Sequence, residues 1–90
     1  MEQVIKALIK DEVKSTKLVI GLNNMGVEAS NFHLNLSNTI LTIVGVKLND
    51  EEFDRYDKMY EEVLNIDIED NKSLNQLTNK IYRYLMKIKH

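Results

Sequence analysis

No proline interrupts this chain of 90 residues, and glycine occurs only at Gly21, Gly26 and Gly45. Proline and glycine are the residues that most often break regular structure, so long uninterrupted helices are open to this sequence. Apolar side chains recur at helical spacing along most of it. A chain of this length forms one domain with a small core. We therefore predict a single helical domain, residues 1–90, that is all-α and folds as a compact four-helix bundle.

The first and third helices are indicated by apolar rows at a helical period. We expect the first over residues 2–22, with the row Val4, Ile5, Leu8, Ile9, Val13 and Ile20. We expect the third over residues 50–65, with the buried face Phe53, Tyr56, Tyr60, Val63 and Leu64. Asn49 or Asp50 can cap the third helix, and the acids after it suit the positive end of the helix dipole.

The fourth helix is predicted over residues 73–88, after a loop over residues 65–72. Ser73 and Gln76 have the spacing of a capping box, which satisfies backbone amides at a helix start. The expected apolar face consists of Leu74, Leu77, Ile81, Leu85 and Ile88. The sequence therefore places a well-defined amphipathic helix at the end of the chain.

The second helix, expected over residues 28–45, has a rival interpretation. Phe32, Leu36, Ile40 and Ile43 form a helical row, which favours a helix ended by Gly45. Alternating apolar residues and the β-branched residues from Thr39 onward instead favour a hairpin. We prefer the helix because no turn dipeptide lies in the middle of the segment. An α+β fold with a hairpin over residues 31–48 is the alternative.

Formal charge is separated along the chain. Residues 50–70 carry ten acids against two bases, whereas residues 71–90 carry five bases and no acid. On a helical projection the basic side chains of the fourth helix lie opposite its apolar face. We therefore expect Lys80, Arg83 and Lys87 to face solvent rather than to reach across to the third helix.

Two sets of residues are predicted to contact a protein partner. One is an uncharged polar row on the second helix: Asn31, Asn35, Asn38 and Thr42. The other is an acidic edge on the third helix: Asp54, Asp57 and Glu61. Depletion of charge is typical of interface cores, and an acidic edge suits a basic partner. The main functional prediction is therefore a small protein-interaction or regulatory module that binds another protein or forms a homodimer.

A nucleic-acid-associated regulator is the alternative function, with Lys80, Arg83 and Lys87 as the residues that would contact phosphate. The net charge of −2 and the acidic third helix argue against it, so we do not expect a nucleic-acid partner.

Nothing in the sequence indicates catalysis. The chain has no cysteine, no metal-binding histidine pattern and no glycine-rich phosphate loop. A small-molecule or enzymatic site near His33 is the least favoured function, and we predict neither a cofactor nor a metal. No stretch of the sequence is apolar enough for a membrane span. The lack of cysteine and of a signal-like N-terminus leads us to expect a cytoplasmic protein.

Overall fold

The computed structural model describes residues 1–89, including all of their side chains except those of residues 30–35. Its regular elements are α1 (Glu2–Asn24), α2 (Ser30–Val44), α3 (Asp50–Glu61), the 3-10 helix η1 (Glu62–Asn65) and α4 (Asn71–Lys89). The protein is an all-α four-helix bundle, as predicted. The alternative hairpin over residues 31–48 is wrong, because α2 is helical over most of that segment.

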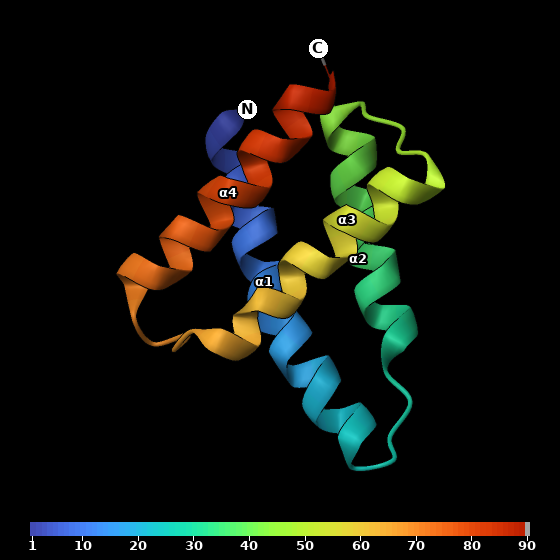
Figure 1. Ribbon diagram of the computed structural model, residues 1–90, viewed down its shortest axis with the longest axis vertical. Coiled ribbons are helices and arrows are strands. Elements are labelled where there is room, and N and C mark those ends of the chain that lie inside the picture. The colour runs from blue at the N-terminus through green and yellow to red at the C-terminus, as the bar shows by residue number, and fades with distance from the viewer. Residues whose placement is uncertain (90) are drawn as a thin grey trace.

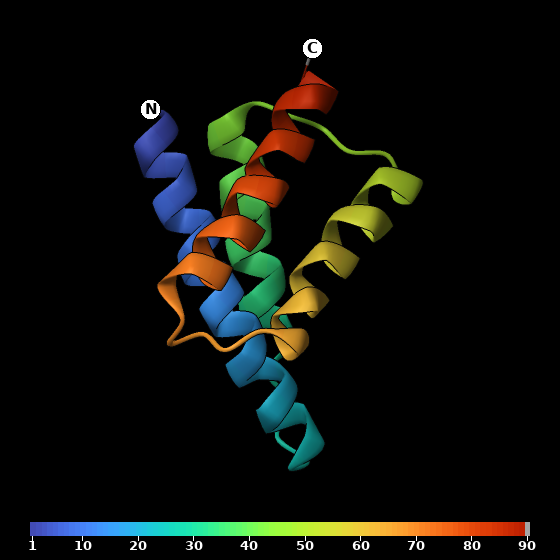
Figure 2. The ribbon, with the colours of Figure 1, turned by 60° about the vertical axis from the view of Figure 1, so that its left-hand side comes forward.

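α1 is the central element, and it contacts α2, α3, η1 and α4 (Figure 1). α4 lies beside the N-terminal half of α1, and α3 contacts both α1 and α4 (Figure 2). In both views the last turns of α1 and the loop that follows it extend beyond the other helices.

A glycine lies at the end of each of the first two helices, and the one at Gly45 was predicted. Gly26 and Gly45 have positive φ angles of 85° and 81°, a conformation that glycine adopts without steric cost. After α1, the amide of Val27 donates to the carbonyl of Leu22 at 2.8 Å, which closes the last turn.

Asn49 caps α3. Its side chain accepts from the amide of Glu52 at 2.8 Å, and the Glu52 carboxylate accepts from the amide of Asn49 at 3.0 Å. This capping box fixes the point at which the chain turns from α2 into α3.

Several predicted helix limits need correction. The first helix continues to Asn24 rather than ending at residue 22, and the second runs from Ser30 to Val44 rather than from residue 28 to residue 45. The third α-helix ends at Glu61 and tightens into η1, rather than continuing to residue 65. The fourth begins at Asn71 rather than at Ser73, and Asp70 takes the capping role expected of Ser73 and Gln76. The Asp70 carboxylate accepts from the amide of Lys72 at 3.1 Å and from the hydroxyl of Ser73 at 2.9 Å.

The core lies where the four helices meet. Ile9, Ile40, Tyr60 and Ile81 come from α1, α2, α3 and α4 in turn, and all four are fully buried. Phe53, Leu8 and Leu48 are partly buried and pack against the same cluster.

Val4 and Leu64 were expected in the core but are exposed. Val4 lies outside the buried row of α1, which follows Ile5 and Ile9. Leu64 belongs to η1, where three residues per turn rotate its side chain off the buried stripe of α3.

Candidate functional site

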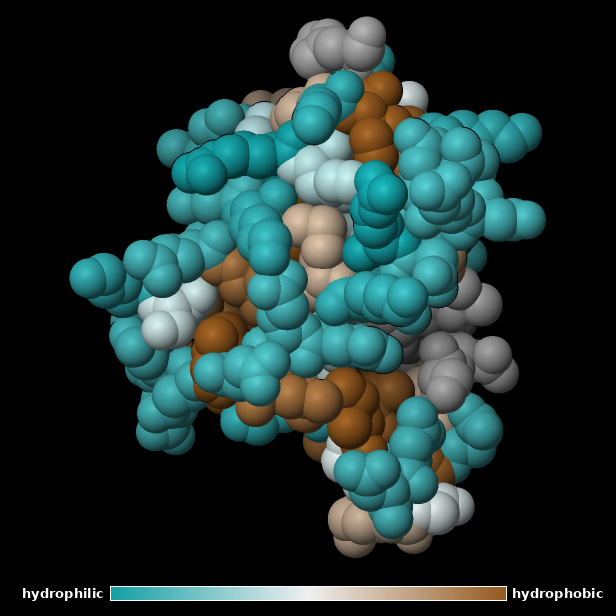
Figure 3. All heavy atoms as spheres, viewed as in Figure 1, coloured by the Kyte–Doolittle hydropathy of each residue, from teal (hydrophilic) through white to brown (hydrophobic). Residues whose placement is uncertain are grey.

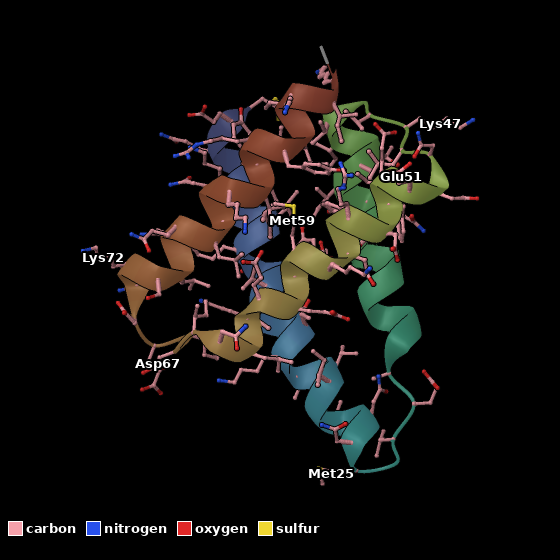
Figure 4. All side chains as sticks on the ribbon, in the orientation of Figure 1. Met25, Lys47, Glu51, Met59, Asp67 and Lys72 are labelled. Carbon is pink, nitrogen blue, oxygen red and sulfur yellow. The ribbon has the colours of Figure 1, made fainter. Side chains whose placement is uncertain are left out.

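A groove between the end of α2 and the start of α3 is the best-formed hollow beside the predicted interaction residues. It has a volume of about 320 Å³ and is lined by Asn38, Leu41, Thr42, Val46, Lys47, Leu48 and Phe53. α3 diverges from α2 at this end, and the loop between them joins the separated helix ends (Figure 2). Lys47 and Glu51 lie at the outer end of this region (Figure 4).

The walls of the α2–α3 groove differ in polarity. Asn38 and Thr42 are exposed, uncharged and one turn apart on α2. Leu48 and Phe53 are only partly buried, so some of their apolar surface remains in contact with water. A segment that entered the groove would meet apolar side chains next to hydrogen-bonding side chains, the usual composition of a binding groove.

Asn38 and Thr42 are the described members of the predicted neutral row, and both are exposed. The hydroxyl of Thr42 donates to the carbonyl of Asn38 at 2.8 Å. Asn31 and Asn35, the other two members, have side chains outside the described part of the structure, as does His33.

The predicted acidic edge of α3 lies beside the groove. Asp57 follows Phe53 by one helical turn, so it lies on the same side of α3. Asp54 pairs with Lys58 at 3.2 Å, and both side chains are largely exposed. Glu61, at the end of α3, is exposed. The edge is therefore acidic, but its negative charge is partly neutralised by Lys58 of the same helix.

The predicted basic surface of α4 is divided by the structure. Arg83 and Lys87 are exposed, as expected. Lys80 instead reaches across to η1, where its ammonium group donates to both carboxylate oxygens of Glu62 at 2.8 Å. The expectation that Lys80 points only to solvent is wrong, because η1 brings Glu62 next to α4.

A buried polar cluster in the core was not predicted. Glu12 on α1 is fully buried, and its carboxylate accepts hydrogen bonds from Ser37 on α2 and from Tyr56 on α3. The hydroxyls of Tyr56 and Tyr60 are hydrogen-bonded at 2.9 Å, and their rings meet edge to face. The cluster thus links three helices through one carboxylate.

Burial controls the acid–base behaviour of the two tyrosines. It raises the pKa of Tyr56, and the nearby carboxylate of Glu12 raises it further. The pKa of Tyr60 is raised well above its usual range, again chiefly by burial and then by the proximity of Tyr56 and Glu12. Both phenols therefore remain protonated across the physiological range.

The cluster is closed to solvent. Glu12, Tyr56 and Tyr60 have no exposed surface, so a substrate cannot reach them in this conformation. Among the described residues, no group of three or more acidic, histidine or cysteine side chains is arranged to hold a metal ion. No described helix is long and apolar enough to cross a membrane. The cluster therefore belongs to the packing of the bundle, and the α2–α3 groove is the stronger candidate site.

Comparison with protein families, characterised proteins and solved structures finds no match to this chain.

Proposed function

We propose that this protein is a non-enzymatic interaction module and that the α2–α3 groove binds a segment of a partner protein. One observation carries the proposal: Asn38 and Thr42, residues expected at an interface from their sequence pattern, line a groove that also has apolar walls. An exposed apolar surface bordered by uncharged hydrogen-bonding groups is suited to protein contacts.

The charges near the groove favour a partner segment that combines an apolar anchor with basic side chains. Leu48 and Phe53 offer partly exposed surface to the anchor. Asp57 and Glu61 lie along the same helix as Phe53, where they would attract lysine or arginine. The lack of cysteine agrees with a cytoplasmic protein, and this location is part of the proposal.

Site-specific photo-crosslinking in the native cell tests the proposal. A photoreactive amino acid replaces Thr42 in the groove or, as a matched exposed control, Arg83 on α4. We expect the Thr42 probe to capture a defined protein that the Arg83 probe does not. Mass spectrometry then identifies the captured protein and its crosslinked segment.

A second variant separates specific docking from chance proximity. Asn38→Lys places a charge at the rim, and desolvating this charge should reduce capture by about tenfold or more while circular dichroism stays unchanged. Equal capture by the two probes, or a folded Asn38→Lys protein with undiminished capture, would overturn the proposal.

A further inference from the structure

The projecting end of α1 is almost free of charge. Glu28 is the only charged residue between Lys17 and Lys47. Within this stretch, the side chains of Leu18 and Met25 are 62% and 79% exposed. Hydrophobic side chains gather over the lower part of the face in Figure 3, where the end of α1 emerges. Met25 lies at the tip in Figure 4. Exposed apolar surface with little charge is typical of a protein contact rather than of a solvated helix end.

Apolar residues near the end of α1 form one stripe, in which Leu18 and Met25 are exposed and Leu22 is half-buried. Leu18, Gly21, Leu22 and Met25 have the spacing i, i+3, i+4 and i+7, which places them on one side of a helix. The opposite side of α1 carries the buried row that includes Val13 and Val19. The helix therefore has two apolar sides, and the bundle covers only one of them.

Gly21 lies in the middle of this stripe, although the local backbone conformation does not require a glycine there. Gly26 and Gly45 have positive φ angles and end helices, whereas Gly21 has an ordinary helical backbone. Glycine weakens a helix relative to alanine, so a helical glycine calls for a compensating contact. In the described part of the chain nothing lies within 4 Å of a Cβ added at Gly21. The notch in the helix surface is therefore open and faces away from the protein.

We infer that this stripe, the α1 tip, is a self-association site at which two copies of the chain pair their α1 helices antiparallel about a twofold axis. In that register each Leu22 packs into the notch at Gly21 of the other copy, and each Leu18 packs against Met25 of the other copy. A stripe that carries both the notch and the side chain that fills it is complementary to itself, as a twofold interface requires.

Charge also selects the antiparallel register. Lys14 and Lys17 lie at one end of the α1 tip, and Glu28 lies just beyond the other. Antiparallel pairing brings the basic end of one copy to the acidic end of the other, whereas parallel pairing would bring like charges together. Three side chains and the Gly21 notch on each copy cover less area than the ~800 Å² that each partner contributes to a stable interface, so the dimer should dissociate on dilution.

Sedimentation equilibrium over a range of concentrations tests the site. Leu18→Lys should raise the dissociation constant by about tenfold or more because a charge enters the contact. The matched control is Leu64→Lys, since Leu64 is 57% exposed but lies on η1. A monomeric parent protein at the highest accessible concentration, or equal effects of the two variants, would overturn the inference.

Gly21→Ala distinguishes a helix crossing from an exposed helix surface. If two helices cross at Gly21, the added methyl group weakens dimerisation although it raises the melting temperature of the monomer. A variant that melts higher and dimerises as well as the parent would refute the crossing.

Disulfide trapping tests the register, because the parent chain has no cysteine. A Leu18→Cys protein mixed with a Met25→Cys protein should form the mixed disulfide faster than either forms a disulfide with itself. Preferential Leu18→Cys self-crosslinking would refute the antiparallel arrangement. None of these experiments alters the α2–α3 groove, so their outcome is independent of the proposed function.

Discussion

Glu12 is the residue on which the packing of three helices depends. A carboxylate in an apolar core costs desolvation free energy that only good hydrogen bonds offset. Here the hydroxyls of Ser37 and Tyr56 supply such bonds, and Thr16, one turn along α1, donates to the Glu12 carbonyl at 2.8 Å. Each donor comes from a fixed position, so the cluster also fixes how α2 and α3 lie against α1.

The sequence held a signal for this cluster that apolar patterning alone overlooks. Glu12 and Thr16 continue the row of Ile5 and Ile9 at spacings of three and four residues, so they lie on the buried side of α1. If only apolar residues are counted as members of the row, Glu12 and Thr16 are both left out of it. No sequence rule identifies the Ser37 and Tyr56 partners, because those contacts join residues 25 and 44 positions away.

Glu12→Ala should lower the free energy of unfolding by about 2–4 kcal/mol. The substitution leaves the buried hydroxyls of Ser37 and Tyr56 without their acceptor and opens a cavity. Chemical denaturation followed by circular dichroism measures the change. Asp11→Ala, at the exposed neighbouring position, is the control and should shift stability by no more than about 0.5 kcal/mol. Similar denaturation midpoints for the two variants would contradict the structural role of Glu12.

The buried tyrosines predict loss of stability at alkaline pH. Their pKa values are raised in the folded protein relative to about 10 for an exposed phenol. The folded state therefore retains its protons where the unfolded state loses them. This contribution is fully present below pH ~10 and is lost as pH rises toward the folded-state pKa.

Denaturation midpoints measured from pH 8 to pH ~11.5 should decrease once the pH exceeds ~10. Tyr60→Phe should flatten that fall because it removes one of the two groups. Ionisation of all four tyrosines near pH ~10 in the folded protein, seen by ultraviolet absorbance, would contradict the assigned burial of Tyr56 and Tyr60.

At the scale of elements, the helices themselves could be predicted well and their ends less so. The glycine at position 45 and the cap at Asn49 are local signals, and both act as their sequence indicates. The start of α4 was misplaced because two residues compete to cap it. Ser73 has a capping-box spacing, but Asp70 accepts hydrogen bonds from both the helix backbone and Ser73 itself. With Asp70 as the cap, the helix begins two residues earlier, at Asn71.

Asp70→Ala should destabilise the protein by about 1 kcal/mol, the usual effect of losing an N-cap. Ser73→Ala should cost less, because the serine hydroxyl serves the Asp70 side chain rather than the backbone. Thermal melts of both variants compare the two caps directly, with exposed Glu69→Ala as the control. A larger loss from Ser73→Ala would instead support the start of α4 at residue 73.

One side of the candidate groove could be predicted from local sequence, and the other depends on contacts between distant segments. Its polar rim could be predicted, since Asn38 and Thr42 belong to a row that is visible in the sequence. The contribution of Leu48 and Phe53 could not, because it depends on how α3 diverges from α2. That angle follows from the packing of the whole bundle, which no local pattern encodes.

On the scale of the whole molecule, charge separation along the chain becomes charge separation in space. The acids lie on α3, whereas the exposed Arg83 and Lys87 lie on α4. The two regions meet near η1, where Lys80 and Glu62 form an exposed ion pair, and near the start of α3, where the hydroxyl of Tyr84 donates to the carbonyl of Glu52 at 3.2 Å. The surface therefore has distinct acidic and basic regions, although the net charge is only −2.

This arrangement predicts different effects for neighbouring charges on α4. Reversing Arg83 and Lys87 together to glutamate should change the free energy of unfolding by no more than about 0.5 kcal/mol, because exposed charges contribute little. Lys80→Glu should cost about 0.5–1 kcal/mol, since it loses the pair with Glu62 and adds repulsion. Chemical denaturation at low and high salt compares them, and salt should reduce only the Lys80→Glu effect.

The same double reversal decides between the two functional classes. If the protein is an interaction module that uses the α2–α3 groove, Arg83→Glu with Lys87→Glu leaves partner capture by the Thr42 probe intact. Fluorescence anisotropy with labelled duplex and single-stranded nucleic acid should detect no binding by the parent protein at physiological salt. Binding that weakens steeply with salt and disappears in the double variant would instead assign the outer side of α4 to phosphate recognition, because release of counterions produces that dependence.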